Sequence, residues 1–196
     1  MGAPAFAQSQ RDIQTMVVDE ALNSRVPPSL ALAVARVESN FNARALSPAG
    51  ARGVMQLMPK TARDVFGVRQ EQLYNARLNI QLGIDFLEQL YMQYGRRWDL
   101  ALSHYNGGTL EGGAGADAVP HSYTRKYVAD VLRWQKFFAD PLRWRPLASR
   151  TPPVRALVAT SREQTVAAAS REWFDIGRRR DLLRRGVDDF KGRSLE

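Results

Sequence analysis

Carboxyl groups are the side chains in this 196-residue sequence best placed to do chemistry. There is no cysteine and there are only two histidines, His104 and His121, so thiol catalysis, cysteine zinc sites and multi-histidine metal sites are excluded. Neither histidine lies in a recognisable serine-triad setting, and no glycine-rich loop has phosphate-binding spacing. Proton transfer by a carboxyl group is therefore the main candidate, and no metal or other cofactor is expected.

Glu38 is the acid whose surroundings stand out. It follows residues 30–37, which belong to the most apolar of the expected helices, and precedes a loop rich in small residues, 42–53. A carboxyl group beside an apolar wall is poorly hydrated, so its pKa rises and it can act as a general acid near neutral pH. Position alone also fits a glutamate that ends a helix and faces water. The neighbouring motifs favour the first interpretation.

Ordered motifs begin at Glu38 and continue along the chain. Residues 38–41 read ESNF, residues 47–51 read SPAGA, and residues 53–62 read GVMQLMPKTA. Further matches follow in order at Asn79, Ile80 and Gly83, at 105–108 (YNGG) and at 124–128 (TRKYV). Together they resemble the lysozyme-like lytic transglycosylases of the soluble Slt type, over roughly residues 25–138. One departure is Gly107, where that family usually has alanine.

The resemblance implies an all-α, lysozyme-like fold and cleavage of the β-1,4 bond between N-acetylmuramic acid and N-acetylglucosamine in peptidoglycan, without water. Glu38 would first protonate the glycosidic oxygen, and the muramic N-acetyl group would stabilise the cationic centre. Glu38 would then act as a base on the C6 hydroxyl, which closes a 1,6-anhydro ring. The matched motifs hold no second acid, and the nearby acids expected on solvated helix faces are Asp64, Glu71, Asp85 and Glu88.

Four side chains of the matched loop are implied as substrate-binding groups. Ser47 would hold the catalytic carboxyl or bond substrate, and Gln56 would bond sugar amides. The alternatives are a serine that begins a turn and an amide that only holds structure. Met55 and Met58 would line the cleft with polarizable surface, or would belong to the core.

Two tyrosines and an asparagine complete the implied site. Tyr105 and Tyr127 would direct a phenol at the N-acetyl group or at the acid while the ring stays buried, and the alternative is a pair of core aromatic residues. Asn106 would face the cleft.

Helical patterns dominate the elements that must position these groups, and we find no strand pattern. Ser29 is the predicted N-cap of the helix that leads to Glu38, and Asn75 is that of the longest helix. The apolar stripe of the longest helix includes Ile80, Ile84 and Leu87. The helices are expected at residues 10–25, 30–40, 60–66, 76–94, 99–105 and 122–138.

Three segments are predicted: a signal remnant with an N-terminal helix at 1–24, a catalytic domain at 25–140, and a basic extension at 141–196. Residues 3–7 resemble the end of a signal peptide, which predicts export to the periplasm; a cytosolic protein with a loose N-terminus is the alternative. The longest apolar run, residues 30–35, is far too short to cross a bilayer, so no transmembrane segment is expected.

Positive charge gathers in the extension. Residues 1–140 hold 15 basic and 13 acidic side chains, whereas residues 141–196 hold 13 and 7. A basic balance favours a polyanionic partner such as nucleic acid, anionic lipid or a carboxylate-rich polymer. A stiff linker is predicted before an amphipathic helix at 160–190, from Pro141, Pro146, Pro152 and Pro153.

The extension has three interpretations: a solvated basic surface, an arm over the cleft, or a helix that docks on a partner. That partner would be the peptidoglycan glycan strands or an assembly protein of a flagellar rod or secretion system. Nucleic acid is not expected, because predicted export separates the chain from it. Two rival functions remain beside the transglycosylase: a hydrolysing muramidase of the same fold, and a non-catalytic wall-binding assembly protein.

Overall fold

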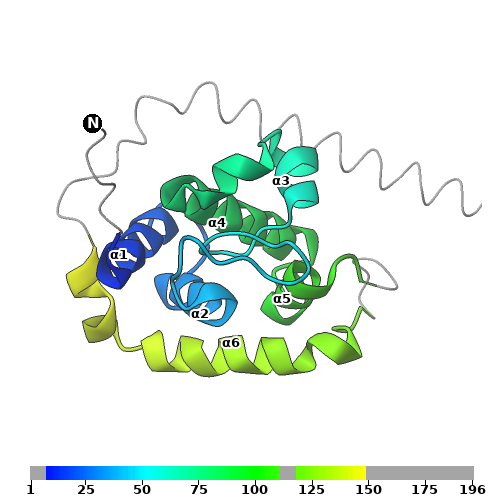
Figure 1. The fold of residues 1–196 in the computed structure, drawn as a ribbon. Coiled ribbons are helices and arrows are strands. Elements are labelled where there is room, and N and C mark those ends of the chain that lie inside the picture. Colours follow the sequence, from blue (N-terminus) through cyan, green and yellow to red (C-terminus); the bar gives the residue numbers. More distant parts are fainter. Residues whose placement is uncertain (1–7, 111–117, 149–196) are drawn as a thin grey trace, which may run out of the picture. The chain divides into compact units, whose positions relative to one another are not determined.

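The computed structural model describes residues 8–110 and 118–148, all of which belong to the unit Met1–Pro153. Within these ranges the chain is helical, and its only β pairing is two isolated bridges, Leu46–Arg52 and Arg52–Leu57. The all-α prediction is therefore confirmed for the described part. The α-helices are α1 (Gln10–Ala21), α2 (Pro28–Ser39), α3 (Pro59–Phe66), α4 (Ala76–Gln93), α5 (Trp98–Gly107) and α6 (Arg125–Phe138) (Figure 1). Short 3₁₀ turns are η1 (Gln70–Tyr74), η2 (Ser122–Thr124), η3 (Pro141–Arg143) and η4 (Arg145–Leu147).

The central helix α2 is apolar all round because it is enclosed by its neighbours. Residues 30–35 are each 0% exposed, and α2 packs against α1 and α6 (Figure 1). It begins at Pro28, so the predicted Ser29 cap is wrong: a proline in the first turn lacks the N–H that a cap would satisfy. It ends at Asn40, whose φ of 52° is left-handed. Glu38 thus lies where the buried helix reaches the surface.

Helix α4 forms the other wall of the core and packs against α1 and α5. Its start confirms the predicted cap, since the Leu78 N–H donates to Asn75 Oδ1 at 3.2 Å. Ile80, Ile84 and Leu87 are all buried, as the apolar stripe predicts. Helix α4 is therefore a well-packed support for the loop that follows Glu38.

Several helix ends differ from the prediction. Helix α1 ends at Ala21 rather than at 25, and the predicted helix 122–138 divides into η2 and α6. Helix α5 extends at both ends, so Gly107 lies in its last turn and not in a loop. No helix in the described ranges combines the length and apolar character that a membrane crossing needs.

The residues just after α6 pack on the helical domain. Trp144, Leu147 and Ala148 lie against the main core cluster, and η4 contacts α1. Residues 141–148, predicted to begin the extension, are thus attached to the core of the preceding helices through these three side chains. The predicted amphipathic helix at 160–190, the prolines at 152 and 153 and the signal-like residues 3–7 lie outside the described residues.

Candidate active site

Glu38 and Tyr127 form the centre of the candidate site. Tyr127, in the first turn of α6, donates its hydroxyl to Glu38 Oε1 at 2.6 Å, although the two residues lie 89 positions apart. Burial raises the pKa of Glu38 from its ordinary 4.5 to about 7, against the lowering effect of the Tyr127 hydrogen bond. Near neutral pH this carboxyl group can therefore both give and take a proton, as the apolar run before it predicts.

Tyr105 lies near the same carboxyl group but contacts the loop instead. Its hydroxyl donates to the Met55 carbonyl oxygen at 2.8 Å. Burial and the charge of Glu38 raise the pKa of Tyr105 and of Tyr127 well above the ordinary value, so both phenols stay protonated and act as donors. Tyr127 thus holds the acid, while Tyr105 holds the loop beside it.

The loop at residues 42–58, which we call the site loop, is tied to three helices. Ser39 on α2 donates its hydroxyl to the Val54 carbonyl at 2.7 Å. Asn79, fully buried on α4, accepts from the Met55 N–H at 2.7 Å and donates to the Arg52 carbonyl at 2.9 Å. With Tyr105 on α5, these bonds fix the loop main chain between α2, α4 and α5 (Figure 1).

Glycine is required at one point of the site loop. Gly53 has a φ of +78°, and an added Cβ would lie 2.5 Å from both Asn79 Nδ2 and the Leu73 carbonyl oxygen. Any side chain there would therefore displace the amide of Asn79 that holds the loop.

Two of the implied substrate-binding residues make bonds inside the site loop. Ser47 Oγ accepts from the Ala51 N–H at 3.0 Å. Gln56 Nε2 donates to the Gly53 carbonyl at 2.9 Å and to the Ala45 carbonyl at 3.3 Å. Both side chains thus hold the turn of the loop, as the alternative interpretation expects. A contact of either side chain with substrate stays a prediction.

The remaining implied residues differ in exposure. Met55 is 0% exposed, and a Cβ on Gly83 would lie 2.5 Å from the Met55 Cβ. The expectation that the Met55 side chain lines a cleft is therefore wrong, because the side chain fills the gap left by the glycine of α4. Met58 is 40% exposed, and Asn106 is exposed in the last turn of α5.

Glu38 differs electrostatically from the other acids. Its pKa is raised, whereas the pKa values of five other acids are lowered: Asp12, Asp64, Glu71, Asp99 and Asp130. The pKa of Asp64 is lowered first by its hydrogen bond to Lys60, and that of Glu71 by main-chain hydrogen bonding. Glu88 pairs with Arg25 at 3.2 Å. Within the described ranges no group of three or more acidic or histidine side chains could hold a metal ion.

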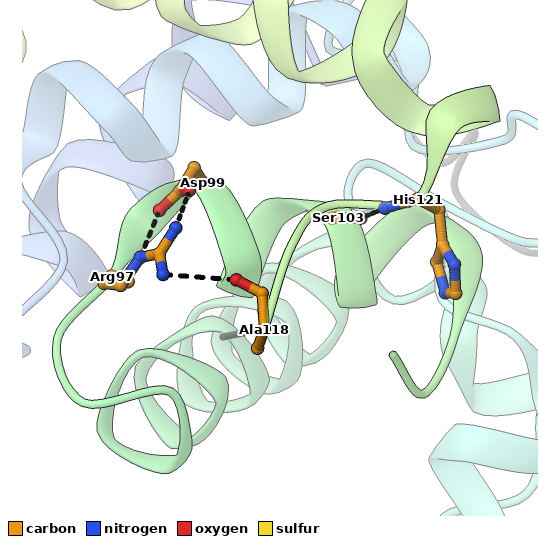
Figure 2. A network of polar contacts seen from close by, with 5 residues as sticks. All are labelled: Arg97, Asp99, Ser103, Ala118 and His121. Atoms are coloured by element: carbon orange, nitrogen blue, oxygen red, sulfur yellow. Dashed lines mark hydrogen bonds and ion pairs between the residues drawn. The ribbon is translucent and has the colours of Figure 1, made fainter. Parts of the chain in front are cut away.

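A polar cluster that sequence reasoning missed positions the start of α6. Ser103, fully buried on α5, accepts from the His121 N–H at 2.9 Å (Figure 2). Its Oγ also lies 2.7 Å from Thr124 Oγ1. Arg97 pairs with Asp99 and donates to the Ala118 carbonyl at 3.2 Å. These bonds fix the segment that leads into η2 and hence into Tyr127. A lone serine within an apolar helix gives no sequence signal of this role.

Comparisons with known proteins agree with these features. The family model of the transglycosylase SLT domain matches residues 16–126. The soluble lytic murein transglycosylase of Escherichia coli K12 is 32% identical over 141 residues, which cover 62% of this chain and 22% of that protein. Membrane-bound lytic murein transglycosylase C of Haemophilus influenzae PittGG is 39% identical over 77 residues, 35% of this chain and 22% of that protein. The chain thus spans about a fifth of the length of these relatives.

Solved structures show the same fold. An inactive mutant of the lytic transglycosylase Slt from Pseudomonas aeruginosa matches with a TM-score of 0.57 and 30% identity over 70% of this chain and 25% of that one. The 70 kDa soluble lytic transglycosylase of E. coli gives 0.56 and 29% over 70% and 26%. The expected all-α, lysozyme-like fold is confirmed by these likenesses.

Proposed function

Because this chain belongs to the transglycosylase SLT domain family, we propose that it is a lytic transglycosylase that cleaves peptidoglycan glycan strands, with Glu38 as its single acid and base. The observation that carries the proposal is the state of Glu38. It is held by Tyr127 at 2.6 Å and has a pKa of about 7, so the proton it gives is one it can also recover.

In the first step, protonated Glu38 gives its proton to the glycosidic oxygen between muramic acid and glucosamine. The bond from that oxygen to C1 breaks, and the leaving sugar departs as an alcohol. The muramic N-acetyl group stabilises the positive charge that develops at C1. Glu38 is then a carboxylate, and the Tyr127 hydroxyl stabilises this form by donating to Oε1.

In the second step, the Glu38 carboxylate takes the proton of the C6 hydroxyl, whose oxygen bonds to C1. The product is a 1,6-anhydro ring, no water is consumed, and Glu38 is protonated again. Glycosidases that act through two carboxyl groups need the second as base or nucleophile. Asp64 and Glu88 are engaged in ion pairs with basic side chains. We therefore assign the second role to Glu38 itself, and the products distinguish this reaction from hydrolysis.

Mass spectrometry of the muropeptides released from purified peptidoglycan tests the reaction. We expect anhydro ends, which lack one water relative to reducing muramic acid ends. Reducing ends would identify a hydrolysing muramidase instead. Glu38→Gln should abolish release while the variant still sediments with the polymer, and full activity of that variant would refute the assignment. A wild-type chain that binds peptidoglycan without releasing fragments would favour the non-catalytic wall-binding alternative.

The periplasm is the proposed location, since peptidoglycan lies outside the cytoplasm. The assembly-protein partner rests on the extension beyond residue 148 and stays a prediction. Comparing the lysis rates of the full chain and of residues 1–148 tests it, because residues 141–148 pack on the core and must be kept. A rate that rises on truncation indicates an inhibitory arm, and a rate that falls only when a candidate assembly protein is present indicates recruitment.

A further inference from the structure

Tyr123 presents an aromatic ring to solvent in a fixed position. At 68% exposed, it is the most exposed aromatic side chain in the described ranges. Its hydroxyl donates to the Gly107 carbonyl at 2.9 Å, and its ring stacks on His121 with centroids 4.8 Å apart and planes 15° apart. Because His121 covers one face of the ring, the exposed area must include the other face.

His121, which supports the ring, is itself held. Its N–H donates to Ser103 Oγ at 2.9 Å, as Figure 2 shows, and its Nε2 lies 3.2 Å from the Thr109 carbonyl oxygen. An exposed tyrosine normally loses rotamer freedom when it binds a ligand. Tyr123 has already lost this freedom in the folded protein, so a ligand that meets its free face does not have to order it.

Gly107 leaves room for this arrangement. A Cβ there would lie 2.7 Å from Thr124 Cγ2, 2.9 Å from Tyr123 Cε2 and 3.1 Å from His121 Cδ2. A side chain at position 107 would therefore push the stacked Tyr123–His121 pair away from the end of α5. This crowding also gives a physical reason for the glycine at the position where the resembling family has alanine.

The ring is connected to both helices that carry tyrosines of the candidate site. Tyr123 lies in η2, which leads directly into α6, and it precedes Tyr127 by four residues. Tyr127 holds Glu38, and the ring is bonded to Gly107, the neighbour of exposed Asn106. Tyr123 is thus fastened between the end of α5, which carries Tyr105, and the start of α6, which carries Tyr127.

We propose that Tyr123, backed by His121, is a sugar-stacking platform that binds one N-acetylhexosamine ring of the glycan strand next to the cleaved bond. The proposal rests on the proposed function. One face of a pyranose ring is a flat array of C–H groups that carry a weak positive charge. The face of an aromatic ring is negative, so the two faces attract each other. The exposed flat face of Tyr123 matches a sugar ring, whereas a peptide segment needs main-chain partners or side-chain pockets.

Binding of the chitin tetrasaccharide to Glu38→Gln protein, measured by calorimetry, tests the platform without turnover. Adding Tyr123→Phe should change the Kd less than twofold. Adding Tyr123→Ala or Tyr123→Leu should weaken binding about tenfold, since an aromatic contact contributes on this scale and leucine supplies bulk without a ring. Phe137→Ala is the matched control, because Phe137 is 45% exposed farther along α6, and should leave the Kd unchanged.

The outcomes separate this proposal from the function on which it rests. A wild-type chain that releases anhydro products, with tetrasaccharide binding unaffected by Tyr123→Ala and Tyr123→Leu, overturns the platform alone. If no anhydro products form, but Tyr123→Ala and Tyr123→Leu each weaken tetrasaccharide binding tenfold, the platform is supported and the transglycosylase reaction is refuted. Equal Tm values for the single and double variants are required, and Gly107→Ala should reproduce the loss by displacing the pair.

Discussion

Replacing Glu38 by glutamine should stabilise the protein at alkaline pH while it abolishes the reaction. The pKa of Glu38 is about 7 in the folded chain against an ordinary 4.5. Between these values the folded state binds more protons than the unfolded state, so the stability that the protonated group contributes is complete below pH 4.5 and is lost as pH rises to 7. The difference in pKa corresponds to about 3 kcal/mol.

Glutamine has the size of the acid, keeps an oxygen that can accept from Tyr127, and carries no charge to desolvate. We therefore expect Glu38→Gln to exceed the wild type by about 2 to 3 kcal/mol in free energy of unfolding at pH 8, and by less than about 1 kcal/mol at pH 4.5. In a domain of this size the gain at pH 8 raises Tm by about 5 to 10 °C.

Urea unfolding and thermal melts at both pH values measure the difference. Glu71→Gln is the matched control, because main-chain and side-chain hydrogen bonds lower the pKa of Glu71 and its ionised form is the favoured one. That variant should show no gain at pH 8. If the advantage of Glu38→Gln is the same at pH 4.5 and pH 8, the pKa of Glu38 is not raised in the folded state and the reasoning is refuted.

Four further results are expected. The rate of peptidoglycan lysis, followed by turbidity from pH 5 to 9, should fall up to tenfold per pH unit above about 7, because Glu38 must be protonated to begin the reaction; a constant rate to pH 9 would contradict this. Tyr127→Phe removes the hydrogen bond that lowers the pKa of Glu38, so the alkaline limb of the same profile should move to higher pH while the maximal rate falls about tenfold. Asn79→Ala leaves the buried Met55 N–H unpaired and leaves the Arg52 carbonyl with the Leu57 N–H as its donor, so it should lower the free energy of unfolding by about 1 to 3 kcal/mol in urea titrations; a loss below about 1 kcal/mol would mean that water replaces the amide. Gly83→Ala should destabilise by about 1 to 3 kcal/mol in the same titrations, instead of adding the roughly 1 kcal/mol that alanine gives within a helix, because its Cβ meets the buried side chain of Met55.

Local sequence made Glu38 a candidate, and the family motifs decided between a desolvated and a solvated carboxyl group. Seven of the eight residues 30–37 are apolar, Arg36 being the exception, and a carboxyl group that follows such a helix where it reaches the surface can be desolvated. The Asn75 cap and the buried stripe of α4 were predictable from local sequence, since both depend on neighbours within one or two helical turns.

Contacts between distant segments were not predictable from local patterns. The burial of Met55 depends on Gly83, which lies on another helix, and neither residue type indicates the other. The Tyr127 bond to Glu38 spans 89 positions, and only the family resemblance drew attention to that tyrosine. The start of α2 at Pro28 instead of Ser29 shows that fixed proline geometry overrides a favourable capping side chain.

The residues on either side of 111–117 are each anchored to the helical domain, which bears on where the chain can accept an insertion. Leu110 and Ala118 are buried, and the Ala118 carbonyl accepts from Arg97, so each end of that stretch is fastened independently to α5 and its surroundings. Closure entropy grows slowly with the length of a connection. Insertions or fusions between these two anchors should therefore leave the spacing of α2 and α6 intact. This makes the stretch a natural position for grafting a targeting module onto the domain.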